Sequence, residues 1–358
     1  MEFDIVRQSN PTKSFRVQSI VGMYDLQQEH QIEHFKGEIA LPEEWNIGLI
    51  VGRSGSGKST IVNHLFADYV VKDFGYSHDN ILDDMPKDCS VSEIAKTFNS
   101  VGFSSPPSWL KPYAVLSNGE KMRVDLARAI LEKRDLFCFD EFTSVVDRNV
   151  AKIGSLAMQK AIRKTKRQFV AVTCHYDVEE WLMPDWVFDT DTMTFHNYEG
   201  QKKNKPELRI DIYETKDKFR FWNAFKKYHY LDNGLNKSAK VFVAFANGYL
   251  CGFTSALQFP HPKLKNVYRL HRTVIFPDYQ GVGIGSILTN SVAQMYIDNG
   301  KSIISTSSNP AIINSRKNSS NWIITHIGRN AGGQSGLKMK TSSNRITCSF
   351  RFIGDGKV

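Results

Sequence analysis

Apolar runs of strand length alternate with runs of helical spacing through the first half of the chain. Strands are predicted over Asn46–Val51, Leu136–Phe139 and Phe169–Thr173, and helices over Ser59–Tyr69 and Ser117–Lys133. Strands that alternate with helices in this way form a parallel sheet with helices on its faces. The pattern therefore predicts an α/β domain.

Further elements are predicted on either side of this alternation. Ser14–Tyr24 and Glu33–Leu41 are predicted strands near the start of the chain. The second half predicts a helix over Lys218–Tyr230, a hairpin of Lys240–Ala246 and Tyr249–Ala256 turned at Asn247-Gly248, strands over Val267–Phe276 and Ser302–Ser307, and a helix over Gly283–Ile297. The whole chain is thus predicted to be α/β.

A polar stretch separates the two halves. Residues 199–206 contain three lysines and end in proline, a composition typical of a linker. We predict a first domain over residues 1–200, a linker over 201–206 and a second domain over 207–358. A chain of 358 residues is long enough for two separate cores.

Composition narrows the class of protein. Apolar residues make up 41% and charged residues 23%, which is ordinary for a globular protein. No apolar run reaches the roughly 18–20 residues of a membrane span, and the first ten residues lack the apolar core of a signal peptide. The five cysteines are scattered without CxxC spacing, as expected for free thiols in a reducing compartment. We therefore expect a cytoplasmic protein with no membrane partner and no zinc site.

The net charge of +9 is unevenly distributed. From residue 206 to the end there are 21 Lys and Arg against 8 Asp and Glu, a net charge of +13, whereas residues 1–205 carry 25 against 29. A basic half favours a polyanionic partner, because each cation near a phosphate backbone releases counterions. The charge indicates nucleic acid, although a basic surface would also suit other anionic ligands.

The segment after the strand Asn46–Val51 fits the phosphate-binding pattern G-x-x-x-x-G-K-[ST]. Its glycines let the backbone wrap phosphates, and its amides act as donors. Lys58 is expected to reach the β- and γ-phosphates of ATP, and the Ser59 hydroxyl to bind Mg²⁺. The predicted ATP-binding residues are Gly52, Ser54, Gly55, Gly57, Lys58, Ser59 and Thr60.

Three later segments complete a set. The sequence Leu-Ser-Asn-Gly-Glu at 116–120 opens a predicted helix, the strand Leu136–Phe139 ends in Asp140-Glu141, and the strand at 170–174 is followed by His175. In this order and spacing the four motifs resemble those of the ABC-type ATPases, over about residues 14–198. The resemblance implies a P-loop NTPase domain of the ABC type.

The same resemblance implies a role for each residue. Asp140 would hold Mg²⁺ through water, Glu141 would orient or deprotonate the attacking water, and His175 would reach the γ-phosphate. Ser117 and Gly119, at a helix N-terminus, would cap the γ-phosphate of ATP bound to a second copy of the chain. ATP would then lie between two copies, which implies a two-fold homodimer.

The chain departs from the ABC pattern at several positions. Asn118 stands where glycine is usual, and Phe142 where proline usually follows the catalytic glutamate. No glutamine occurs between positions 60 and 116, so His78, Asp79 and Asn80 remain as substitutes for the usual Q-loop residue. These departures leave open whether ATP is hydrolysed during the cycle or mainly holds a dimer together.

The spacing of the motifs distinguishes between kinds of ABC protein. Ser117 lies only 59 positions after Lys58, and transporter cassettes have a longer helical segment there to grip their membrane partner. We therefore expect a soluble ABC ATPase that acts on the second half of its own chain. The resemblance also implies an aromatic residue stacked on the base of ATP, with Tyr24 and Phe15 as candidates.

A second glycine-rich loop, Gln280–Gly285, follows the strand Val267–Phe276. A dinucleotide-binding fold needs an acidic residue at the end of the next strand, and Ser302–Ser307 has none. The fuller pattern over 277–288 resembles that of the GNAT acyl-CoA N-acyltransferases, a likeness that extends over roughly residues 208–328. It implies acetyl-CoA or another acyl-CoA as cofactor, with the pyrophosphate at a helix N-terminus. The implied cofactor-binding residues are Gln280, Val282, Gly283, Gly285 and Ser286.

The usual catalytic partners of the GNAT family are missing. Acyl transfer to an amine needs a base, an acid and an oxyanion stabiliser. The helix predicted over Asn309–Arg316 has no tyrosine to act as the acid, and no glutamate occurs after Glu214 to act as the usual base. His229 and Tyr230, at a predicted helix end, are the catalytic candidates. The alternative is that this pair packs on the core.

The His-Tyr pair, the basic charge and the loop resemble the Mom-type phage DNA modification enzymes, which have a GNAT fold and alter adenine. This resemblance implies roles for His229, Tyr230, Arg272 and Ser286, and less directly for Asn309 and Trp322. Enzymes that modify a base extrude it from the stack, and Trp222, Tyr228 and Trp322 are candidates to stack on it.

Three functions follow from these features. The first is a nucleic-acid-modifying acyltransferase whose ABC half dimerises on ATP. The second is an N-acetyltransferase for a protein or a small amine, regulated by ATP. The third is a binding module that responds to CoA and ATP without catalysis, because the usual tyrosine and glutamate are absent.

Overall fold

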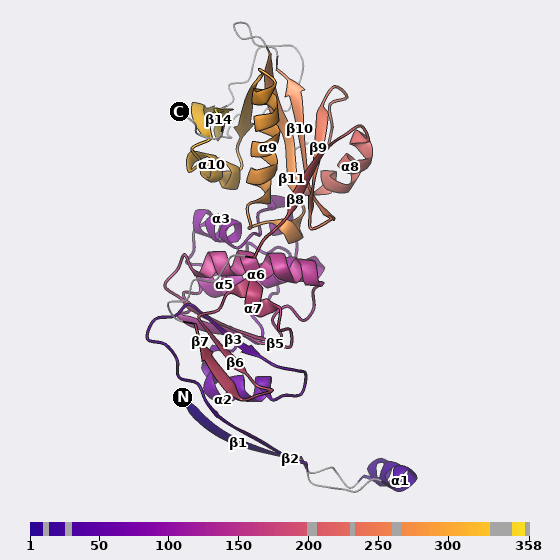
Figure 1. The fold of residues 1–358 in the computed structure, drawn as a ribbon, viewed down its shortest axis with the longest axis vertical. Coiled ribbons are helices and arrows are strands. Elements are labelled where there is room, and N and C mark those ends of the chain that lie inside the picture. Colours follow the sequence, from indigo (N-terminus) through magenta and orange to yellow (C-terminus); the bar gives the residue numbers. More distant parts are fainter. Residues whose placement is uncertain are drawn as a thin grey trace. The chain divides into compact units, whose positions relative to one another are not determined.

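The computed structural model describes residues 1–9, 14–25, 31–198, 206–229, 233–259, 266–329 and 346–354. Its helices and sheets confirm the predicted α/β class (Figure 1). The chain divides into two compact units. The first comprises Met1–Phe74, Arg134–Val145 and Ile162–Lys205, and the second comprises Gly75–Lys133, Val146–Ala161 and Pro206–Val358. Packing thus joins two segments of the first half to the chain that follows the linker, of which residues 201–205 lie outside the described part.

A five-stranded sheet forms the centre of the first unit, in the order β4-β5-β3-β6-β7. Strands β3, β4, β5 and β6 are parallel, and β7 is antiparallel to β6. The elements are β3 (Ile47–Val51), α2 (Lys58–Leu65), η1 (Ala67–Tyr69), β4 (Leu136–Phe139), β5 (Gln168–Thr173), α7 (Val178–Leu182), β6 (Trp186–Asp189) and β7 (Thr194–Asn197).

The core of the first unit explains why β3 has an unbroken apolar sequence. All five of its residues are buried, as expected of a strand inside a parallel sheet. Ile61 and Val62 of α2 pack there with Val170 and Trp186. Gly48 lies directly against the Trp186 ring, where a Cβ atom would come within 2.0 Å of a ring carbon, so the strand accepts only glycine at that position.

The N-terminal segment differs from its predicted structure. Strands β1 (Glu2–Ser9) and β2 (Gln31–Glu38) form an antiparallel pair, and β2 confirms the strand predicted at Glu33–Leu41. The strand predicted over Ser14–Tyr24 is wrong, because Phe15–Tyr24 forms helix α1. Ser14 caps this helix by accepting a hydrogen bond from the Val17 amide. None of the α1 residues is buried, so its apolar side chains do not form one face of a sheet.

The second unit contains a group of helices from the first half of the sequence. They are α3 (Val91–Ser100), α4 (Pro106–Trp109), η2 (Tyr113–Val115), α5 (Asn118–Leu131) and α6 (Arg148–Ile162). Ser117 begins α5 in a capping box, accepting from the Glu120 amide while the Glu120 carboxylate accepts from the Ser117 amide. The N-terminus of α5 is thereby fixed.

A seven-stranded sheet forms the rest of the second unit, in the order β13-β14-β12-β11-β10-β9-β8. Only the pair β11 and β12 is parallel among these described strands. The elements are β8 (Ile210–Thr215), α8 (Lys218–Phe225), η3 (Lys226–Tyr228), β9 (Lys240–Ala246), β10 (Tyr249–Gln258), β11 (Val267–Ile275), η4 (Pro277–Tyr279), α9 (Ile284–Asp298), β12 (Ser302–Ser307), α10 (Pro310–Lys317), β13 (Trp322–Arg329) and β14 (Ile346–Phe352).

Helices cover both faces of this sheet. Along β9 the side chains alternate, so Phe242 packs in one core with Leu288 of α9, and Val243 packs in the other with Trp222 of α8. Figure 1 shows α9 lying along strands β10 and β11. Helix α9 begins immediately after the second glycine-rich loop, so its core contacts fix the place of that loop. Over the described ranges, no helix is both long and apolar enough to cross a bilayer.

Candidate functional site

The first glycine-rich loop connects β3 to α2. Gly55 and Gly57 have φ angles of 84° and 86°, a left-handed conformation that glycine adopts without strain. The Lys58 ammonium donates to the carbonyls of Gly52 and Arg53, at 2.8 and 2.7 Å. The lysine therefore folds over the loop and lies beside the backbone that would hold phosphates.

The remaining predicted residues of this loop take two positions. Ser54 lies exposed within the loop, while Ser59 and Thr60 lie in the first turn of α2. The Arg53 amide donates to the Asp191 carboxylate at 3.0 Å, which ties the loop to the end of β6. The loop thus places hydroxyls and amides together at a helix N-terminus, an arrangement that suits an anion.

The predicted catalytic residues of the first half follow two neighbouring strands. Asp140 and Glu141 come directly after β4, and His175 comes two residues after β5. The parallel strands β4, β5 and β3 are adjacent, so their carboxyl ends meet at one edge of the sheet. Ligands of open α/β sheets bind at that edge. The structure therefore brings Asp140, Glu141 and His175 to the same edge as the Lys58 loop.

Local backbone geometry orients the acidic pair. The Glu141 amide donates to the Asp140 carboxylate at 2.9 Å, and Glu141 has a φ of 56°, which few residues other than glycine adopt. This turn leaves Glu141 exposed, while Asp140 is half-buried.

Residues of this edge suit Mg²⁺ bound together with a nucleotide. The Ser59 hydroxyl and the Asp140 carboxylate are hard oxygen donors, and Mg²⁺ usually takes its remaining ligands from water and phosphate. Among the described residues, no three His, Cys, Asp or Glu side chains gather as a self-sufficient metal site. The donor set thus fits a metal that arrives with its nucleotide.

Other residues singled out in the first half have different positions. Phe15 and Tyr24, the candidates to stack on the base, lie on α1 and are 85% and 66% exposed. His78, a candidate for the Q-loop role, pairs through its ring with the Asp84 carboxylate at 2.8 Å. Ser117 and Gly119 lie at the start of α5 in the second unit.

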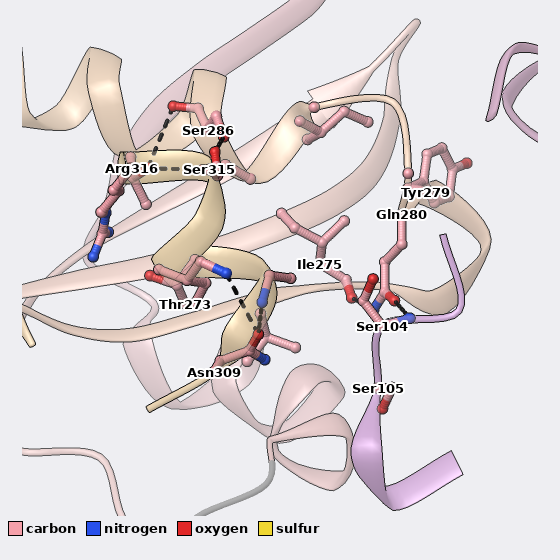
Figure 2. Close-up of a pocket in the computed structure, with 18 of the residues that line it drawn as sticks. Ser104, Ser105, Thr273, Ile275, Tyr279, Gln280, Ser286, Asn309, Ser315 and Arg316 are labelled. Carbon is pink, nitrogen blue, oxygen red and sulfur yellow. Dashed lines mark hydrogen bonds between the residues drawn. The ribbon is translucent and has the colours of Figure 1, made fainter. Parts of the chain in front are cut away.

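A pocket of about 270 Å³ lies in the second unit beside the second glycine-rich loop (Figure 2). It brings together five of the residues predicted for the acyltransferase half, which are His229, Gln280, Gly283, Gly285 and Ser286. Val282 is not among the lining residues and packs instead against the core beneath α9. Tyr230, the other catalytic candidate, lies outside the described residues.

The loop itself presents a helix N-terminus to the pocket. Gly283 has a φ of 96° and precedes the first residue of α9, and Gly285 and Ser286 form the first turn. The Ser286 hydroxyl is hydrogen-bonded to that of Ser315 on α10, at 2.8 Å. A helix N-terminus with open backbone space suits a pyrophosphate.

The Gln280 side chain joins two walls of the pocket through hydrogen bonds. Its oxygen accepts from the Ser104 amide at 2.8 Å, and its nitrogen donates to the Ile275 carbonyl at 2.9 Å. Figure 2 shows Gln280 between Ile275 and Ser104. Gln280 therefore connects β11 to a segment that lies 176 positions earlier in the chain.

His229 lies at the end of η3 and is 8% exposed. Its ring packs edge-on against Trp222, with 5.6 Å between ring centroids. Trp222 is buried in the core under α8, which leaves Tyr228 as the aromatic residue of this segment that lines the pocket. His229 thus combines a core contact with a place on the pocket wall.

The other residues implied by the Mom-type resemblance have structural contacts. Arg272 donates to the Gly234 carbonyl at 3.0 Å, and Asn309 caps α10 by accepting from the Ala311 amide at 2.8 Å. Trp322 is buried and donates from its indole to the Asn290 side chain at 2.8 Å. Asn309 and Trp322 line the pocket and Arg272 does not.

The sequence analysis missed several polar residues of this pocket, among them Ser104, Ser105 and Arg316. Ser104 and Ser105 come from the segment between α3 and α4, and Ser105 is buried with no hydrogen-bond partner for its hydroxyl among the described residues. Arg316 of α10 is also buried, and this burial lowers its pKa. No local pattern marks any of the three, because tertiary packing alone brings them to the pocket.

Comparisons with known proteins find sequence similarity to acetyltransferases and to an ATP-binding cassette protein. The model of the acetyltransferase (GNAT) family matches residues 177–314. The mRNA export factor elf1 of Schizosaccharomyces pombe is 28% identical over 152 residues, which are 36% of this chain and 14% of that protein. A probable ATP-binding cassette sub-family F member 3 homolog of Encephalitozoon cuniculi is 31% identical over 110 residues, 28% of this chain and 19% of that protein. The chain thus spans less than a fifth of the length of either relative.

Solved structures give fold likenesses at low scores. A dimeric ATP-binding cassette bound to ADP and phosphate is 16% identical, covers 55% of this chain and 100% of its own, and has a TM-score of 0.37. In sequence, residues 177–314 are thus similar to the GNAT acetyltransferases, and the chain is also similar to an ATP-binding cassette protein.

Proposed function

We propose that this chain is an acyl-CoA-dependent N-acyltransferase that modifies nucleic acid and is controlled by ATP-driven dimerisation. The observation that carries the proposal is the pocket beside Gly283, whose lining includes a helix N-terminus and the buried Arg316. An anionic cofactor is suited to such a place, and the acyltransferase segment supplies the reaction class.

In this proposal His229 receives the proton that the acceptor amine loses when its nitrogen attacks the thioester carbonyl. A C–N bond then forms and the C–S bond breaks, and the departing thiolate takes a proton from water. His229 supports this role because it is the titratable imidazole on the pocket wall. His229→Gln is expected to lower kcat while leaving the Kd for coenzyme A within a few-fold.

In the first unit the edge that carries Lys58, Asp140, Glu141 and His175 is proposed to bind Mg²⁺ and ATP. Two chains would close on the nucleotide, with Ser117 and Gly119 of the second copy against the γ-phosphate. Binding of ATP would thus set the oligomeric state.

The choice of nucleic acid as the acceptor rests on charge near the pocket. Arg220 and Lys227 are exposed on α8 and η3, the segment that also brings Tyr228 and His229 to the pocket. The Lys227 ammonium lies 4.9 Å from the centre of the Tyr228 ring. Cations beside an aromatic wall favour a phosphate backbone with an unstacked base.

Mass spectrometry distinguishes this proposal from transfer to a protein or small amine. Nucleosides and proteins from cells expressing the wild type would be compared with those from cells expressing Gly283→Glu. An acylated nucleoside present only with the wild type supports the proposal. Acylated protein without a modified nucleoside would replace nucleic acid by a protein acceptor.

A further inference from the structure

The turn that leads into the acyl-CoA loop packs on the N-terminus of α5. Arg123 of α5 is 2% exposed and donates to the main-chain carbonyl of Asp278 at 2.7 Å. Its other terminal nitrogen donates to the Gly119 carbonyl at 3.1 Å. One buried guanidinium therefore bridges the start of α5 and the turn before the loop. All of these residues belong to the second unit.

The carboxylate of Asp278 lies against the two residues assigned to the γ-phosphate. One of its oxygens is 3.4 Å from the Ser117 hydroxyl, which donates to it. A Cβ atom on Gly119 would lie 2.5 Å from the same oxygen. A carboxylate at a helix N-terminus complements the helix dipole as a phosphate would. Asp278 thus occupies the position that the proposed ATP sandwich gives to the γ-phosphate of the second copy.

The same turn forms part of the pocket wall. Gln280, two residues after Asp278, is held by the Ser104 amide, and the backbones of Gly102 and Gly281 touch. A Cβ atom on Gly281 would lie 2.9 Å from the Gly102 Cα atom. Because the turn is packed this closely, a displacement of Asp278 also moves the residues that line the pocket.

The surroundings of Asp278 hold its carboxylate only weakly at the N-terminus of α5. Burial raises the pKa of this carboxyl, and the negative charges of Glu120 and Asp147 add to the rise, while Arg123 and the Ser117 hydrogen bond oppose it. A phosphate brings more negative charge and more acceptor oxygens than one carboxylate, so it is the stronger ligand for the same helix end.

We propose that Arg123 and Asp278 are positioning residues through which nucleotide binding at Ser117 and Gly119 weakens acyl-CoA binding. The inference rests on the proposed function and deepens it by naming the regulation of the acyl-CoA site. The γ-phosphate of the second copy displaces the Asp278 carboxylate, and the turn before Gln280 then loses its support. Because coupling between two ligands is reciprocal, acyl-CoA weakens the ATP-bound dimer by the same factor.

Calorimetry on the full chain tests this coupling. Coenzyme A is titrated into the wild type without nucleotide and with a saturating non-hydrolysable ATP analogue and Mg²⁺. We expect the Kd for coenzyme A to rise about tenfold with the analogue. Asp278→Ala keeps the main-chain hydrogen bond to Arg123 but removes the carboxylate beside Ser117 and Gly119. In this variant the ratio of the two Kd values is expected to fall below two. Asp298→Ala, the same charge change at the far end of α9, is the matched control and keeps the tenfold ratio.

The outcomes separate this inference from the proposed function. Binding of both ligands with a ratio near one in the wild type, or tighter coenzyme A binding with the analogue, overturns the coupling alone. An unchanged tenfold ratio in Asp278→Ala shows that the coupling does not run through Asp278 and also overturns it. If coenzyme A gives no binding heat under any condition, the acyltransferase proposal fails, and the coupling fails with it.

Discussion

The guanidinium of Arg316 stacks on the ring of Trp322, with its central carbon 4.3 Å from the ring centroid. It also donates to the Ser305 hydroxyl. Among the described residues Arg316 has no carboxylate partner, although a buried cation is costly without a counter-charge. It lines the pocket, so an anion bound there would supply that charge.

Arg316→Met is therefore expected to weaken coenzyme A binding about tenfold or more, because the pocket loses its buried cation. Methionine keeps most of the apolar contact with Trp322, so the melting temperature is expected to stay within a few degrees. Calorimetry with coenzyme A measures the change. Arg351→Met, at an exposed position of β14, is the control and is expected to bind as the wild type does. Equal affinities in the two variants would contradict the assignment of Arg316 to the ligand.

Gly283→Glu is expected to abolish detectable coenzyme A binding while ATP hydrolysis continues. The new carboxylate would repel the pyrophosphate at the start of α9, and the left-handed backbone adds strain of about 1 kcal/mol. Gly248→Glu provides a matched control, because Gly248 has a φ of 86° and equally open space but lies in the β9–β10 turn. Should both variants lose binding equally, backbone strain rather than the loop would account for the loss.

Glu141→Gln is expected to accumulate as an ATP-bound dimer, because a neutral amide neither deprotonates water nor repels the γ-phosphate. Size-exclusion chromatography with light scattering, run with and without ATP and Mg²⁺, measures the mass. Glu44→Gln, an exposed position of the same unit, is the control and is expected not to accumulate as a dimer. A Glu141→Gln variant that remains monomeric with bound ATP would rule out the nucleotide sandwich.

Tyr296 is buried under the second sheet, and its hydroxyl has no hydrogen-bond partner among the described residues. Burial raises its pKa to about 12. The folded state therefore holds the proton more tightly than the unfolded chain, so this contribution to stability is full below pH 10 and is lost as the pH rises from 10 to 12. Tyr296→Phe is expected to remove up to about 1–3 kcal/mol of that dependence. Urea unfolding from pH 8 to 11 measures it, and parallel curves for the two proteins would contradict the burial effect.

The thiols differ in reactivity for the same physical reason. Cys138 and Cys251 are fully buried, and burial raises the pKa of each to about 12. Their thiolate fraction at pH 8 is then about one in ten thousand. Iodoacetamide is expected to label half-buried Cys174 at least a hundredfold faster in the native protein, as followed by peptide mass spectrometry. Denatured protein, in which all cysteines react alike, is the control. Equal native rates for Cys138 and Cys174 would show that the core opens readily.

The sequence predicted those parts of the fold that local pattern determines. The strands predicted over Leu136–Phe139 and Ser302–Ser307 have the observed bounds. The first is an apolar run that is buried in its sheet, and the second has side chains that alternate between buried and more exposed positions. Helix α1 was missed because an apolar run of that length suits a strand or a helix, and the Ser14 cap determines which forms. The glycine-rich loops were found because their backbone conformations require glycine.

Contacts between segments far apart in the chain could not be predicted from the local sequence pattern. Ser104 meets Gln280 across 176 positions, and Arg123 meets Asp278 across 155. Neither contact leaves a periodic signal, because each depends on how helices of the first half pack against the seven-stranded sheet. Only the structure therefore identifies Ser104 and Ser105 as lining residues of the pocket.

The close contact of Gly102 with Gly281 means that the seven-stranded sheet cannot be separated from the helices of the second unit as an independent domain. A fragment cut at the linker would keep the loop and α9 but would lose the segment that closes one side of the pocket and satisfies Gln280. The same contact restricts exchange between proteins, since neither backbone leaves room for a side chain on the other. A recombinant protein that takes the second half of this chain must therefore also take residues 75–133, because the two segments fold together.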